Sequence, residues 1–297
     1  MKRIIFVPGK NLKPPPEAYH HQLQRCLLHG VARHDPAAAD EIREQGAFSL
    51  VAWNYTYYHQ YRDIAQDIPW IDKLLARSSH DENDIRDIRQ MRYLLAKFLY
   101  NTGDVLPWLI PLIPDQRIKS SIVETRHYFE NRNNIACRIR DLQKAPLREA
   151  VASDDRVLLI GHSLGSVIAY DSLWELHHLE NITRCIDCLL TIGSPLGLRF
   201  VQRRLLGHDK PESQRYPGNI RRWVNISSHG DLVALDKTLN NDYPAMLKAH
   251  CLDHIEDHHE GIFNYYRDDR GLNVHKSYGY LVNPEVGKLI AEWWQQA

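Results

Sequence analysis

The pentapeptide GHSLG at residues 161–165 constrains this chain more than any other feature. It directly follows the apolar run VLLI and directly precedes the helical run SVIAYDSLWEL. A G-x-S-x-G in this context indicates a tight strand-to-helix turn, because a Cβ at either glycine would clash and the serine must adopt a strained conformation. The hydroxyl of Ser163 then projects above the sheet, and the backbone N–H of Leu164 lies at a helix N-terminus, which favours negative charge. A turn that cradles a phosphate, or is tight for packing alone, is the alternative interpretation.

The segments around this turn alternate between strands and helices. Residues 18–31 and 164–179 have apolar residues at helical spacing, and a short helix precedes residue 48. The apolar, β-branched runs predict strands at IIFV (4–7), FSLVAW (48–53), RVLLIG (156–161), CIDCLLTIG (185–193) and RRWVNIS (221–227). Strands of this kind predict an α/β fold with a mostly parallel central sheet flanked by helices. We expect residues 1–53 and 155–297 to form this core.

Residues 54–154 contain no convincing strand. The periodic stretches 85–100 and 120–142 predict helices. We therefore expect a helical insertion over residues 54–154, of which the last helix is the crossover that returns the chain to the sheet.

The composition excludes several classes of protein. The 297 residues include 37 Lys plus Arg and 37 Asp plus Glu, a balance that argues against a nucleic-acid partner. No run reaches the roughly 18 apolar residues of a membrane helix, so no integral membrane segment is expected. The N-terminal apolar run is too short for a secretory signal, and five cysteines argue against a disulfide framework. We therefore expect a cytoplasmic protein.

Through VLLIGHSLGS at residues 157–166, the sequence resembles the serine esterases and lipases of the α/β-hydrolase superfamily. The resemblance implies the chain order nucleophile, acid, histidine, with the last two at strand ends. Asp231 is the first acid after the strand WVNIS, with Asp236 as its rival, and His275 lies just before a helix-like C-terminal segment. The implied catalytic triad is Ser163, Asp231 and His275, which works through an acyl-enzyme and needs no cofactor.

The start of the chain fits the same resemblance. Many members have His-Gly where this chain has Pro8-Gly9, in the loop that supplies an oxyanion donor after the first strand. The donor is a backbone amide, so the substitution need not abolish the role. The resemblance thus implies an oxyanion hole formed by the amide of Leu164 and that of Lys10, with Asn11 as the alternative to Lys10.

Two other patterns suggest metal ligands. His254 and His258 in HIEDHHE have the spacing of a metal pair on a helix, but the segment lacks the H-E-x-x-H order and is mostly charged. A solvated face is the better interpretation. Cys185 and Cys188 form a lone C-x-x-C inside an apolar run, which a buried strand explains better than zinc. We expect no metal site.

These features predict an enzyme that hydrolyses a carboxylic ester of a lipid or a small molecule; thioesters are not excluded. The proline-broken run LPWLIPLIP at residues 106–114 is a candidate for the acyl-binding part of a lid, through Trp108, Leu109 and Ile110. Packing within the lid is the alternative for these residues. The alternative function is a catalytically inactive binding or scaffold protein on the same fold.

Overall fold

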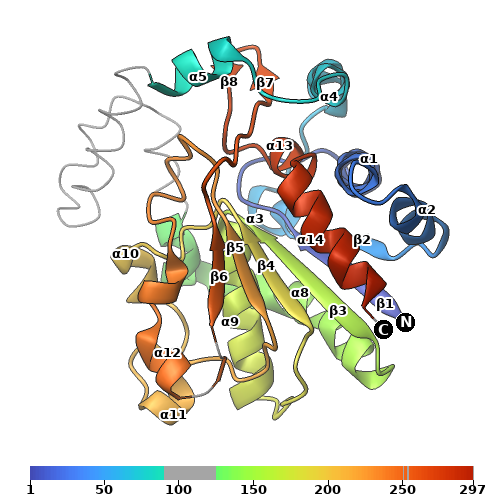
Figure 1. Ribbon diagram of the computed structural model, residues 1–297. Helices are drawn as coiled ribbons and strands as arrows, with labels where there is room; N and C mark the ends of the chain where they lie inside the picture. Colours follow the sequence, from blue (N-terminus) through green and yellow to red (C-terminus); the bar gives the residue numbers. More distant parts are fainter. Residues whose placement is uncertain (90–124, 250, 253, 297) are drawn as a thin grey trace.

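A six-stranded parallel sheet forms the centre of the computed structural model, which describes residues 1–89, 125–249, 251–252 and 254–296 (Figure 1). The strand order is β2-β1-β3-β4-β5-β6, and every neighbouring pair is parallel. The strands are β1 (Lys2–Val7), β2 (Phe48–Leu50), β3 (Arg156–His162), β4 (Cys188–Ile192), β5 (Trp223–Ile226) and β6 (Ile255–His258). The predicted α/β fold class is therefore confirmed.

Helices cover both faces of the sheet. In β1, Ile4 and Phe6 belong to one apolar core, and Ile5 and Val7 belong to the other. The helices on the first face are α1 (Pro16–Ala32), α2 (Pro36–Glu44), α13 (Ser277–Leu281) and α14 (Pro284–Gln295), and those on the second are α8 (Ile135–Ala152) and α9 (Leu164–His178) (Figure 1). Because β3, β4 and β5 are buried on both faces, their sequences are mostly apolar rather than alternating.

The direction in which the sheet grows reverses between β1 and β3. From β1 the chain passes through α1 and α2 to β2 at one edge, whereas β3 to β6 extend the sheet toward the other edge. A reversal of this kind leaves a crevice beyond the carboxyl ends of the two strands. The loop after β1 and the turn after β3 meet there, since a Cβ built on Gly9 would lie only 2.7 Å from Cβ of Ser163.

The described parts of residues 54–154 contain helices and no strand. They include α3 (Asn54–Tyr58), η1 (Ile64–Gln66), α4 (Ile68–Leu75), α5 (Glu82–Arg89), a helical stretch at 125–130, η3 (Arg132–Asn134) and α8. As expected for a crossover, α8 packs against α9 and leads directly into β3. The boundaries of the insertion and its role as a lid remain predictions. No helix in the described part of the chain is long and apolar enough to cross a membrane.

The single helix predicted over residues 120–142 is wrong. The chain breaks between the helical residues 125–130 and α8, where Asn131, Asn133 and Asn134 have φ values of 45°, 54° and 57°. Asparagine tolerates this left-handed conformation better than most residues. The side chain of Asn131 also accepts a hydrogen bond from the amide of Ala136 at 2.9 Å, which satisfies a donor in the first turn of α8.

The C-terminal third contains strands that the sequence did not predict. Residues Ile255–His258 of the HIEDHHE segment form the edge strand β6, so the helical spacing considered for a metal pair at His254 and His258 does not apply. An edge strand with one open side tolerates the charged residues that hid its pattern. A small antiparallel hairpin, β7 (Arg267–Asp268) and β8 (Gly271–Leu272), follows near α4 and α5 (Figure 1). The predicted strand at 48–53 is also shorter, since β2 ends at Leu50.

Candidate active site

Ser163 occupies the sharp turn between β3 and α9. Its backbone has φ 55° and ψ −128°, a conformation that costs a residue with a side chain about 1–3 kcal/mol. Both neighbouring glycines are required by close backbone contacts. A Cβ on Gly161 would lie 2.6 Å from Cα of Ser166, and one on Gly165 would lie 2.1 Å from the carbonyl oxygen of Val7. The local sequence therefore folds into a turn that lifts the serine side chain toward the crevice.

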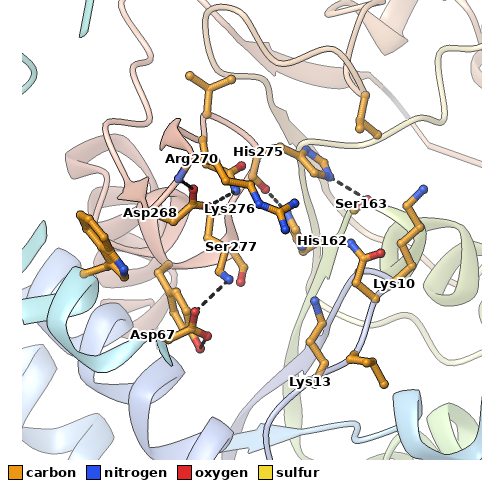
Figure 2. A pocket seen from close by; sticks show the side chains of 18 of the residues that line it. Lys10, Lys13, Asp67, His162, Ser163, Asp268, Arg270, His275, Lys276 and Ser277 are labelled. Atoms are coloured by element: carbon orange, nitrogen blue, oxygen red, sulfur yellow. Dashed lines mark hydrogen bonds and ion pairs between the residues drawn. The ribbon is translucent and has the colours of Figure 1, made fainter. Parts of the chain in front are cut away.

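Three of the predicted site residues form one hydrogen-bonded chain. Nε2 of His275 lies 2.9 Å from Oγ of Ser163 (Figure 2), and Nδ1 of His275 lies 2.8 Å from Oδ2 of Asp231. Because a carboxylate only accepts, Nδ1 carries the proton and Nε2 can accept one from the serine hydroxyl. Asp236, the rival acid, instead accepts a hydrogen bond from the amide of Thr238 at 3.3 Å. The structure thus brings Asp231 to the histidine.

The carboxyl group of Asp231 is fully buried and well supplied with donors. Its Oδ1 accepts a hydrogen bond from the amide of Val233 at 2.9 Å, and its Oδ2 accepts a second bond, from the Tyr280 hydroxyl, at 2.6 Å. Burial alone raises the pKa of Asp231, but the charge of His275 and the hydrogen bonds from His275, Tyr280 and Val233 outweigh it, and the pKa is lowered. The carboxylate is therefore ionised beside the imidazole at neutral pH.

Two residues that the sequence did not point to support the hydrogen-bonded chain of Ser163, His275 and Asp231. Tyr280 accepts a hydrogen bond from the amide of Ser228 at 3.0 Å, which orients its hydroxyl toward Asp231. His162 is buried beneath the loop that carries His275, and its Nε2 lies 2.8 Å from the backbone carbonyl oxygen of His275. Burial, then the charges of His275 and Lys13, hold the pKa of His162 well below its usual value. A neutral His162 donates Nε2–H to this carbonyl group and so helps to hold the loop.

The loop after β1 is held by side chains from α3 and the residue before it. Trp53 donates Nε1–H to the carbonyl oxygen of Pro8 at 2.8 Å, and Asn54 donates to that of Gly9 at 2.9 Å. The amide of Asn11 donates to the hydroxyl of Tyr58 at 2.8 Å. Since the Asn11 amide is already engaged, this geometry favours Lys10 over Asn11 as the second donor of the predicted oxyanion hole. Leu164, the other predicted donor, begins α9, where amides lack acceptors within the helix.

A cleft of about 860 Å³ opens in front of Ser163 and His275. One part of its lining is apolar: Leu12, Trp70, Leu232, Val233, Leu272 and Val274. Another part is charged, with Lys10, Lys13, Asp67, Arg270 and Lys276 around the crevice (Figure 2). The predicted acyl-site residues Trp108, Leu109 and Ile110 lie outside the described residues.

The histidines and cysteines considered as metal ligands have other partners or positions. Because β6 runs from Ile255 to His258 directly after His254, the extended chain separates the two histidines by about 13 Å, too far for them to share an ion. Nε2 of His254 lies 3.6 Å from Glu256, and Nδ1 of His258 lies 3.2 Å from Glu285. Burial raises the pKa of Cys188 to about 12, which disfavours the thiolate that zinc requires. Within the described ranges no cluster of three or more His, Cys, Asp or Glu residues is arranged to hold a metal.

The sequence is similar to part of a Saccharomyces cerevisiae protein named as a probable mitochondrial phospholipase. The two are 30% identical over 146 residues, which are 48% of this chain but only 17% of the yeast protein. No family model and no solved structure matches the chain. The similarity to this relative and the parallel α/β sheet together fit a hydrolase-like fold.

Proposed function

We propose that the protein is a serine hydrolase that cleaves carboxylic esters, with Ser163 as nucleophile, His275 as general base and Asp231 as the acid that orients it. The observation that carries the proposal is the continuous chain of hydrogen bonds, at 2.9 Å and 2.8 Å, that ends on a serine held in a strained strand-to-helix turn. Strain of this kind at an exposed crevice is typical of functional residues.

The proposed reaction has two steps. As Oγ of Ser163 bonds to the ester carbon, its proton moves to Nε2 of His275, and the resulting imidazolium is stabilised by Asp231. The bond from the ester carbon to the alcohol oxygen then breaks, and the alcohol leaves with that proton. In the second step water attacks the acyl carbon and gives a proton to Nε2 of His275. The bond from the acyl carbon to Oγ of Ser163 then breaks, His275 returns the proton to Oγ, and the carboxylic acid leaves.

The oxyanion of each tetrahedral intermediate needs donors that are in place before the reaction. We assign this role to the backbone amides of Leu164 and Lys10. The assignment is supported by the position of Leu164 at the start of α9 and by the contact of the Gly9 backbone with Ser163. Removing such a donor typically lowers kcat by about 10²–10³-fold.

The proposed substrate is an ester with an apolar acyl group, such as a lipid ester. The apolar part of the cleft supports this class of substrate. Leu232 and Val233 directly follow Asp231 in the chain, and Val274 directly precedes His275. The partial similarity to a protein named as a probable phospholipase supports the same class of substrate. We also assign an acyl-binding role to Trp108, Leu109 and Ile110. A thioester presents the same acyl carbon, so matched oxygen and sulfur esters should be assayed together.

Labelling with a fluorophosphonate probe tests the proposal directly. The purified protein should be labelled at Ser163 and should hydrolyse short p-nitrophenyl esters. Ser163→Ala should abolish labelling and lower kcat by on the order of 10⁴-fold or more, because only binding and oxyanion effects remain. Ser153→Ala, at an exposed serine after α8, is the matched control and should change neither. A folded Ser163→Ala protein with normal turnover would contradict the proposal, and an unreactive wild type would favour the inactive scaffold.

A further inference from the structure

We propose that Lys10, Lys13 and Arg270 form a subsite for a phosphate group carried by the alcohol portion of the ester substrate. The inference rests on the proposed function for the position of the scissile ester at Ser163. It adds a chemical class for the part of the substrate that leaves first.

The three cations reach one cleft from two separate segments. Lys10 and Lys13 come from the loop after β1, and Arg270 comes from the turn between β7 and β8. Figure 2 shows the Arg270 side chain extending across the cleft toward the loop that bears Lys10 and Lys13, with Ser163 and His275 beside them. Lys10 is only 6% exposed, so its ammonium group is held at the cleft rather than in bulk solvent. Segments far apart in the sequence thus converge beside the serine.

Two of the four acids that line the cleft, Asp67 and Asp231, are engaged by other groups. Asp67 forms ion pairs with Arg62 and with Lys276, the latter at 3.3 Å. Asp231 lies beneath His275. These contacts leave Asp268 and Asp269 as the remaining carboxylates of the lining, opposed by the three cations of the proposed subsite.

The positive charge also lies close to the catalytic end of the cleft. After burial and the charge of His275, the charge of Lys13 is the next cause that lowers the pKa of His162. His162 directly precedes Ser163 and contacts the backbone of His275. The loop bearing Lys13 therefore places its charge within range of the reacting groups.

The turn that carries Arg270 is firmly held. The amide of Arg270 donates to Oδ1 of Asp268 at 3.0 Å, and Asn273 donates to Oδ2 of the same aspartate at 3.0 Å. At the base of the hairpin, Arg267 forms an ion pair with Asp87 of α5 at 2.7 Å. Over the ranges that the structure describes, the Arg270 guanidinium forms no ion pair of its own. A fixed turn thus presents a guanidinium that is available to an anion.

The donor set favours phosphate over other anions. A guanidinium has a planar fork of N–H donors that matches two phosphate oxygens, and two ammonium groups can serve the remaining oxygen and charge. A carboxylate has only two oxygens and would leave part of this set unused. Since the acyl group is assigned to the apolar part of the cleft, the phosphate belongs to the alcohol portion.

Matched esters test the subsite through selectivity. The substrates are octanoyl glycerol phosphate, uncharged octanoyl glycerol and an octanoyl ester of glyceric acid. The wild type should have a higher kcat/KM for the phosphate ester than for the two other esters. Lys13→Gln and Arg270→Gln should each lower the ratio of kcat/KM for the phosphate ester to that for the uncharged ester about tenfold, as expected for the loss of a charge-assisted hydrogen bond. The control Arg203→Gln changes an exposed arginine that does not line the cleft and should leave the ratio unchanged. Arg270→Lys should retain part of it.

An unchanged ratio in a folded Lys13→Gln/Arg270→Gln double variant would overturn the subsite. An equal preference for the glyceric acid ester would overturn its assignment to phosphate. Folding of each variant is checked by its melting temperature.

Binding to Ser163→Ala separates the subsite from the proposed hydrolysis. Octyl phosphate contains no carboxylic ester, and calorimetry should show that it binds more tightly than inorganic phosphate. Its affinity should fall about tenfold in the double variant and fall again as salt shortens the screening length from about 10 Å at 0.1 M to about 3 Å at 1 M. Equal affinity for octyl phosphate with and without the Lys13→Gln and Arg270→Gln substitutions, or no binding at all, overturns the subsite even if neutral esters are cleaved. Binding of octyl phosphate without cleavage of any ester would overturn the proposed function and leave the subsite standing.

Discussion

The hydroxyl of Tyr280 donates a 2.6 Å hydrogen bond to Oδ2 of Asp231, the oxygen that also accepts from His275. Burial and the neighbouring Asp231 raise the pKa of Tyr280 well above its usual value, so the phenol stays protonated and remains a donor. The amide of Ser228 donates to the same hydroxyl and fixes its direction. Tyr280 is therefore a positioning residue for the proposed acid.

Tyr280→Phe should lower kcat about tenfold with little change in KM, because Asp231 loses a donor and the Ser228 amide loses its acceptor. The hydrogen bond from Tyr280 helps to lower the pKa of Asp231, so its loss raises that pKa. Activity should then fall at a higher pH on the acid side of the pH–rate profile. Tyr243→Phe is the matched control, since this buried hydroxyl bonds to the carbonyl oxygen of Leu196 instead. The same kcat and pH profile in both variants would contradict the role of Tyr280.

Replacement of the two candidate acids should have very different effects. Asp231→Asn should reduce kcat by on the order of 10⁴-fold, because an amide cannot hold the imidazole in the required tautomer. Asp236→Asn should stay within a few-fold of wild type, since the side chain of Asp236 bonds to Thr238 and not to His275. Steady-state kinetics on one p-nitrophenyl ester measures both. The reverse ranking in folded proteins would move the acid to Asp236.

Gly193→Ala should impair activity beyond its effect on stability. Gly193 has φ 55°, and a Cβ there would lie 2.9 Å from Oδ2 of Asp231 and 3.2 Å from Nδ1 of His275. Gly46→Ala is the matched control, because Gly46 has φ 58° and no atom lies within 4 Å of the Cβ that the substitution would add. Both variants should lose about 1–2 kcal/mol of unfolding free energy from the left-handed backbone. Only Gly193→Ala should also lose at least tenfold in kcat/KM by pushing the hydrogen-bonded pair apart, an estimate from the cost of small misplacements in active sites. Equal activities would show that the contact is tolerated.

Because of the buried Asp171, the free energy of unfolding should fall as pH rises. This residue of α9 is buried, and burial raises its pKa from 3.8 to about 6 despite hydrogen bonds from Leu206 and Tyr128. A carboxyl group whose folded pKa is above its unfolded pKa stabilises the fold fully below the unfolded pKa, and that contribution is lost as pH rises through the folded pKa. Asp171→Asn should therefore be less unfavourable at about pH 7.5 than at about pH 4, as measured by urea unfolding. An equal change in unfolding free energy at both pH values would refute this.

By itself, the sequence determined the features that depend on a few neighbouring residues. The apolar runs separated by helical stretches predicted the confirmed α/β fold, because strands buried on both faces have a composition of their own. The turn at Ser163 could be predicted because its glycines and its strained φ are local requirements of the backbone. The resemblance to the α/β-hydrolase superfamily implied Asp231 and His275 through their order along the chain, and the structure places Asp231 beside His275 and His275 beside Ser163.

Only the tertiary structure decided the contacts that depend on how distant segments meet. Tyr280 reaches Asp231 across 49 positions, and Gly193, directly after β4, lies against Asp231 and His275. No local pattern predicts such contacts, because hydrogen bonds between side chains depend on the register of the sheet and the path of the loops. The strand β6 was hidden for the same reason, since its charged side chains are stabilised by position at a sheet edge rather than by an apolar repeat. The order of the elements therefore depends on local sequence. The surroundings of the proposed nucleophile depend on the crevice beyond the carboxyl ends of β1 and β3.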